Sequence, residues 1–117
     1  MKRLLLFSLV LTACNLSASL LGEGREYAYT PAYLVEGQGH TFTVTFTVAD
    51  RVVTGLKIEP GAITSAERGS QLAFSANVRQ YVVLKSIDEI ELPASVGEEE
   101  QLTQVFQGVL GQLRGDL

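Results

Sequence analysis

The 117-residue chain is poor in the side chains that carry most enzyme chemistry: it has one cysteine and one histidine. A lone cysteine, Cys14, cannot form an internal disulfide. His40 has no second histidine and no domain cysteine as a co-ligand, so we expect a surface or strand-start histidine and no metal site. No Ser–His–Asp or Cys–His set can be assembled, which disfavours a hydrolytic enzyme.

Basic residues are also few and scattered after Lys2 and Arg3. The chain has nine Lys and Arg against 13 Asp and Glu, and its formal net charge is -4. A nucleic-acid surface needs clustered basic residues that replace counterions. The composition therefore argues against a nucleic-acid partner.

The N-terminal segment has the layout of a secretory signal. Lys2 and Arg3 precede a short apolar run, Leu4 to Leu11. This run is too short to span a bilayer, which takes about 20 residues. We expect residues 1–13 to be a signal peptide of the lipoprotein type.

The residues that follow the apolar run, Leu11 to Cys14, resemble the bacterial lipobox. In that motif the cysteine is acylated and becomes the new N-terminus, and buried acyl chains hold a protein on a membrane. We therefore expect Cys14 to carry a lipid anchor, which places the protein outside the cytoplasm on a membrane of the cell envelope. The alternative is an incidental thiol, with cleavage further on, after Ala18.

Residues 14–24 are small and polar and read as a tether, so the folded domain is expected over 25–117. Threonines at 41, 43, 45 and 47 alternate with Phe and Val, and this period of two predicts a half-buried strand with a solvated threonine face. A second β-rich run follows Asp50 and Arg51, which predicts a hairpin. An earlier strand is expected over 27–35, bent or placed at an edge by Pro31.

Helical periodicity begins later in the chain. Residues 61–69 read as a loop, and a helix is expected over 70–85. Two S-x-x-E capping boxes follow, at 86–89 before a short helical turn and at 95–98 before a last amphipathic helix over about 98–113. Together the elements predict an α+β fold, a small curved antiparallel sheet with two main helices packed on one face.

Two further groups of residues invite a functional interpretation. Asp88, Glu89 and Glu91 are candidate acid–base carboxylates, but capping explains Glu89 and the preference for negative charge at a helix start explains Asp88 more simply. The four tyrosines are a candidate stacking platform, although core or sheet-face positions are the commoner role. These tyrosines are Tyr27, Tyr29, Tyr33 and Tyr81.

Several stretches resemble the small FMN-binding-domain proteins over about Tyr27 to Leu113. The matching residues are Phe46 to Asp50, Val52 to Gly55, Ser65, Gln71, Phe74, Lys85 to Ile90, Leu102, Thr103 and the last helix. The resemblance implies a half-barrel-like antiparallel sheet with flanking helices. It also implies flavin binding and electron transfer at the outer side of a membrane.

The chain departs from that family at the start of the last helix. Flavin-carrying members have a Ser-Gly-Ala-Thr-like segment there, whose backbone N–H groups approach the phosphate. The corresponding candidate cofactor-binding residues here are Ser95, Gly97 and Thr103, and we expect three consecutive glutamates, Glu98 to Glu100, to fill the anion site. A phosphate about 4 Å from one carboxylate would be repelled by about 1–4 kcal/mol. In a subset of the family a threonine of this segment holds the FMN covalently. Thr103 lies roughly a turn and a half into the helix, so that role does not carry over to it.

The sequence therefore predicts a membrane-anchored binding or structural module with an FMN-binding-like fold and no bound flavin. An envelope protein is the expected partner. The alternative is an FMN-binding electron-transfer protein that holds the flavin on another surface, such as the tyrosines near Tyr27 and Tyr81.

Overall fold

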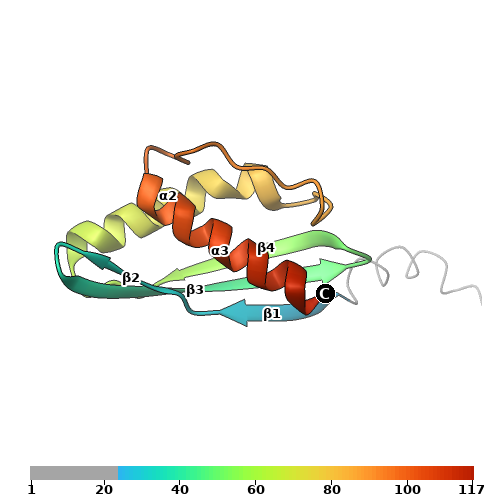
Figure 1. Ribbon diagram of the computed structural model, residues 1–117, viewed down its shortest axis with the longest axis horizontal. Helices are drawn as coiled ribbons and strands as arrows, with labels where there is room; N and C mark the ends of the chain where they lie inside the picture. The colour runs from blue at the N-terminus through green and yellow to red at the C-terminus, as the bar shows by residue number, and fades with distance from the viewer. Residues whose placement is uncertain (1–23) are drawn as a thin grey trace, which may run out of the picture.

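The computed structural model describes residues 24–117 (Figure 1). Its strands are β1 (Arg25–Tyr29), β2 (Ala32–Val35), β3 (Gln38–Ala49) and β4 (Val52–Pro60), and its helices are α2 (Ser65–Val82) and α3 (Glu100–Asp116). The strands form an open antiparallel sheet, and both helices lie on one of its faces. The predicted α+β architecture is confirmed, whereas the predicted signal peptide, Cys14 and nearly all of the predicted tether lie outside the described residues.

β1 and β2 are one strand interrupted at Thr30 and Pro31. Both pair with β3, and Tyr29 lies opposite Val44 while Ala32 lies opposite Thr41, so the register continues across the break. Proline interrupts the strand because it has no N–H to donate to the ladder. The bend predicted at Pro31 is therefore confirmed.

The β3–β4 hairpin is also confirmed, with Asp50 and Arg51 as its two-residue turn. Both residues have positive φ, 53° and 63°, as the primed turns of tight hairpins require. The guanidinium of Arg51 donates to the carboxylate of Asp88 at 2.8 and 3.1 Å. This contact lowers the pKa of Asp88, and both side chains are exposed, so the pair is a surface ion pair.

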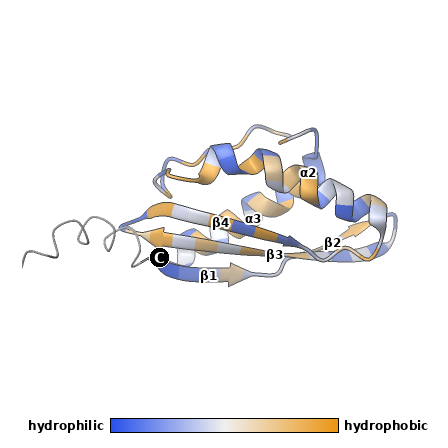
Figure 2. Ribbon diagram, turned by 180° about the vertical axis from the view of Figure 1, so that it is seen from behind, coloured by the Kyte–Doolittle hydropathy of each residue, from blue (hydrophilic) through white to orange (hydrophobic). Residues whose placement is uncertain are grey.

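The core lies between the sheet and the two helices. Apolar and polar residues alternate along β3 and β4 (Figure 2), and from Phe42 onward the buried residues of β3 are the apolar ones, so its threonines lie on the opposite face of the sheet. At the centre of the core the ring of Phe106 contacts the rings of Phe46 and Phe74, with centroid distances of 5.8 and 5.6 Å. This aromatic cluster joins β3, α2 and α3.

α2 begins at Ser65, earlier than the sequence predicted, and ends at Val82. The reason is a capping residue in the stretch interpreted as a loop. The hydroxyl of Thr64 accepts a hydrogen bond from the backbone N–H of Glu67 at 3.2 Å, which satisfies one of the free donors of the first turn. Gly69 therefore lies inside the helix.

The segment after α2 pairs with the sheet; a single hydrogen-bonded turn forms at 86–89, but the capping box predicted there is wrong. The backbone N–H of Val53 donates to Lys85 and that of Ile87 donates to Arg51, at 3.0 and 2.8 Å. The Ser86 hydroxyl accepts from Asp88 in a hydrogen-bonded turn that does not continue as a helix. This segment covers one end of the outer edge of β4.

Candidate functional site

The start of α3, where the family resemblance places a phosphate, is built from a tight turn. Gly97 and Glu98 have positive φ, 58° and 66°, and the backbone N–H of Glu99 donates to the carbonyl of Val96 at 3.0 Å. Glu99 is the N-cap residue, and its side chain makes no capping hydrogen bond. Ser95 is exposed and lies before the turn, so the capping box predicted at 95–98 is wrong.

Thr103 fastens this turn to α3. Its side chain is 1% exposed. Its hydroxyl accepts from the backbone N–H of Val96 at 2.8 Å and donates to the carbonyl of Glu99 at 2.7 Å. Of the three candidate cofactor-binding residues, Thr103 is therefore committed to the fold, whereas Ser95 and Gly97 remain exposed.

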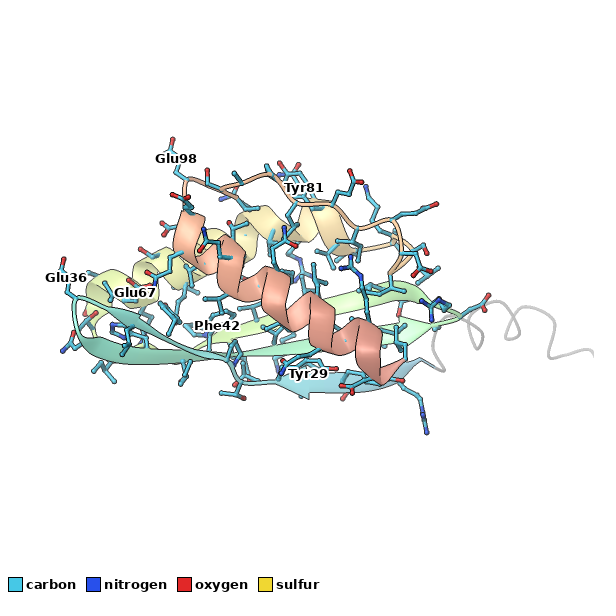
Figure 3. All side chains as sticks on the ribbon, viewed as in Figure 1. Tyr29, Glu36, Phe42, Glu67, Tyr81 and Glu98 are labelled. Carbon is cyan, nitrogen blue, oxygen red and sulfur yellow. The ribbon has the colours of Figure 1, made fainter. Side chains whose placement is uncertain are left out.

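The three consecutive glutamates do not form one cluster at the helix end. Glu98 lies in the turn and points away from the domain (Figure 3), and Glu100 is also exposed. Only Glu99 is partly buried; burial and the neighbouring charges of Glu67 and Glu98 raise its pKa, while a hydrogen bond from Ser70 opposes the rise. Negative charge is thus present at the start of α3, but the expectation that all three carboxylates fill the site is corrected.

A raised pKa fixes the direction in which Glu99 couples folding to pH. The folded state binds its proton more tightly than the unfolded chain does, so Glu99 favours folding most below its ordinary pKa of about 4.3. That contribution declines as the pH rises through the raised value. A second anion near Glu99 would be disfavoured because it would add to the negative charge that Glu67 and Glu98 already place beside this carboxylate.

The tyrosines serve separate contacts and form no common platform. Tyr33 lies in the core and donates to the carboxylate of Glu67 at 2.6 Å, and Tyr29 donates to the carboxylate of Asp116 at 2.6 Å. Desolvation and then the partner carboxylate raise the pKa of both phenols. Tyr81 lies on α2, well apart from Tyr29 (Figure 3).

His40 is near the start of β3, as one of the sequence-based alternatives had it, but it is buried rather than at the surface. Its side chain is 3% exposed and packs beside Tyr33, with ring centroids 5.8 Å apart. Within the described part of the chain its Nδ1 has no hydrogen-bond partner. Residues 24–117 contain no group of three His, Cys, Asp or Glu side chains that could hold a metal ion.

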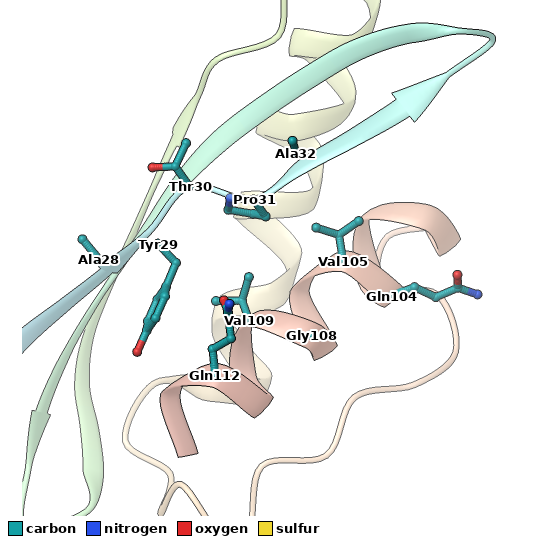
Figure 4. A pocket seen from close by; sticks show the side chains of 10 residues that line it. All are labelled: Ala28, Tyr29, Thr30, Pro31, Ala32, Gln104, Val105, Gly108, Val109 and Gln112. Carbon is teal, nitrogen blue, oxygen red and sulfur yellow. The ribbon is translucent and has the colours of Figure 1, made fainter. Parts of the chain in front are cut away.

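The sequence did not predict the groove that lies between the β1–β2 break and α3. It has a volume of about 680 Å³ and is lined by ten residues with no charged side chain among them (Figure 4). They are Ala28, Tyr29, Thr30, Pro31, Ala32, Gln104, Val105, Gly108, Val109 and Gln112. A Cβ atom at Gly108 would meet no atom within 4 Å, so this glycine leaves open space on the helix side.

Among residues 24–117, no helix is long and apolar enough to cross a membrane. No protein-family model, curated protein or solved structure matches the chain.

Proposed function

We propose that this protein is an extracytoplasmic lipoprotein that is anchored to a membrane through Cys14. Its domain is a binding module that holds no flavin, and the start of α3 binds no flavin phosphate. The observation that carries the cofactor part is the double hydrogen bond of Thr103. Its hydroxyl already joins Val96 to Glu99 at 2.8 and 2.7 Å. A phosphate at this position would have to displace a buried contact of the domain itself.

Electrostatics support the same proposal. A helix N-terminus attracts an anion by about 0.3–1 kcal/mol. A carboxylate about 4 Å from a phosphate repels it by about 1–4 kcal/mol, depending on the local dielectric. Glu99 is the partly buried N-cap residue of α3, and one ionised carboxylate at that distance is enough to offset the attraction of the helix.

The second candidate is an FMN-binding electron-transfer protein that holds the flavin in the groove beside α3. Small-molecule sites commonly have volumes of about 300–1,000 Å³, and the groove falls within this range at about 680 Å³. The ring of Tyr29 forms part of its wall, and the phosphate of FMN would have to stay in solvent because no charged side chain among residues 24–117 lines the groove. In this candidate the start of α3 holds no ligand, and the protein is still a flavoprotein because the flavin lies in the groove.

A titration with FMN tests the cofactor part of the proposal. The full chain, purified in mild detergent, is mixed with FMN, and flavin fluorescence is followed. We expect no saturable quenching up to about 100 µM FMN, a concentration that would reveal binding stronger than about 5 kcal/mol. Saturable binding would contradict the proposal. In that case the Gly108→Leu variant would decide between the groove and the start of α3, because only groove binding would be lost.

Mass spectrometry of the protein isolated from membranes tests the anchor. We expect the mature chain to begin at Cys14 and to carry added acyl mass, because several acyl chains are needed for stable anchoring. A Cys14→Ser variant should leave the membrane fraction. A mature protein that begins after Ala18 and carries no acyl mass would contradict the anchor.

A further inference from the structure

One wall of the groove beside α3 is the outer edge of the interrupted strand β1–β2. The backbone N–H of Phe42 donates to the carbonyl of Pro31 at 3.4 Å, so Pro31 faces β3. In an antiparallel pair the backbone groups of successive residues point alternately toward and away from the partner strand. The N–H and C=O groups of Thr30 and Ala32 therefore point outward, into the groove.

A side-chain contact further along the strand agrees with this alternation. The carbonyl of Leu34, two residues after Ala32, accepts a hydrogen bond from the side-chain amide of Gln101 at 2.7 Å. An α3 side chain thus already bonds to the outer edge at Leu34. The edge between Ala28 and Ala32 offers the same kind of backbone groups beside the groove.

α3 forms the other wall of the groove, and the α3 residues in this wall are uncharged and partly apolar (Figure 4). Val105 is half-buried and provides apolar surface, Val109 lies behind the wall at 2% exposed, Gly108 leaves open space, and the amides of Gln104 and Gln112 complete the wall. A charged ligand group buried here would lose its hydration without gaining an ionic partner. The lining is therefore suited to a neutral ligand that supplies both hydrogen-bond donors and acceptors.

We propose that this groove binds an extended peptide segment of a partner protein, added as a further antiparallel strand along β1–β2. The proposal rests on the proposed function as a binding module, and it names the partner chemistry. An extended strand lies about 4.8 Å from its neighbour and directs every second side chain to the same face. Its inward side chains would be small and apolar, opposite Val105 and Gly108, and its backbone would bond to Thr30 and Ala32.

Charge at one end of the groove refines the partner further. The carboxylate of Asp116 lies beside Tyr29, 2.6 Å from its hydroxyl, where the groove approaches the end of α3. An antiparallel peptide runs from the Leu34 end toward this carboxylate. A basic residue near the C-terminal end of the bound segment would therefore be favoured.

The test uses a defined peptide and fluorescence anisotropy. The probe is a labelled hexapeptide, N-acetylated and C-amidated, of alternating threonine and valine with lysine at its last position. It is titrated with the full chain in mild detergent, and we expect saturable binding with a Kd of about 10–500 µM. The same peptide with methyl groups on alternate backbone nitrogens that face the strand should bind at least about tenfold more weakly, since the ladder hydrogen bonds are lost.

Matched glycine variants on α3 locate the binding. Gly108→Leu should abolish peptide binding because its side chain fills the hollow. Gly115→Leu, which also meets no atom within 4 Å and lies outside the groove, should bind as the unmodified protein does. Leucine is a better helix former than glycine, so neither change is expected to unfold the domain.

Four outcomes would overturn the peptide proposal: no saturable binding, equal binding of the N-methylated peptide, no effect of Gly108→Leu, or self-association of the protein that Gly108→Leu abolishes. The last would assign the groove to a second copy. None of them affects the expected absence of flavin, which is measured separately. Peptide binding that FMN displaces would instead contradict the proposed function.

Discussion

Replacing Gln71 with alanine is expected to lower the free energy of unfolding by about 3–5 kcal/mol. The side chain is 1% exposed. Its carbonyl oxygen accepts from the backbone N–H groups of Gly61 and Ala62 at 3.0 and 3.1 Å, and its amide donates to the Tyr33 hydroxyl and the Thr41 carbonyl, both at 2.9 Å. Alanine would leave the buried N–H of Ala62 without a partner, which costs about 1–3 kcal/mol, and would remove three further hydrogen bonds worth about 0.5–1.5 kcal/mol each, although the Tyr33 hydroxyl keeps its bond to Glu67.

Urea denaturation followed by circular dichroism measures the loss, with Gln80→Ala as the matched control. Gln80 is exposed on the same helix and donates only to the nearby carbonyl of Asn77 at 3.2 Å. Its replacement should change the stability by no more than about 0.5 kcal/mol. Equal stabilities of the two variants would show that the Gln71 network contributes little.

Gln71→Glu separates the accepting half of this network from the donating half. An ionised glutamate still accepts from Gly61 and Ala62 but cannot donate to Tyr33 or Thr41. Burial and the nearby Glu67 carboxylate would raise the pKa of the new side chain. The variant should therefore be most stable at low pH, where the protonated acid donates again, and should lose stability as the pH rises through that raised pKa.

The elements that the sequence predicted well are those governed by local pattern. The alternation along β3 and the apolar stripe of α3 are each contained in one segment, so the hairpin and the last helix follow from them. The start of α2 was missed although Thr64 and Glu67 form a recognisable capping pair. The glycines at 61 and 69 suggested a loop. Gly69 lies inside α2 all the same, because the cap at Thr64 stabilises the start of the helix more than this glycine destabilises it.

The site was harder to predict because its contacts join distant segments. Gln71 has the sequence of an ordinary polar helix residue, and its burial depends on partners in β2, β3 and the loop before α2. The role of Thr103 depends on a turn whose glycine and glutamate adopt positive φ. The groove requires both the break at Pro31 and the missing side chain at Gly108, and neither position indicates the other.

The second large effect is expected for Phe106→Ala, which should lower the free energy of unfolding by about 3–5 kcal/mol. Phe106 has no exposed surface, and its ring packs against Phe46 of β3 and Phe74 of α2. Alanine would remove apolar contacts with both and leave a cavity that the rigid sheet can fill only in part.

Phe106→Leu and Gln107→Ala make this prediction specific when all three variants are compared by urea denaturation. Leucine retains most of the apolar volume, so we expect a loss nearer 1–2 kcal/mol. Gln107 is the exposed neighbour on α3, and its replacement should leave the stability within about 0.5 kcal/mol. If Phe106→Ala lowers the free energy of unfolding no more than Phe106→Leu does, the cavity closes. The aromatic cluster would then not be what holds α3, and with it one wall of the groove, against the sheet.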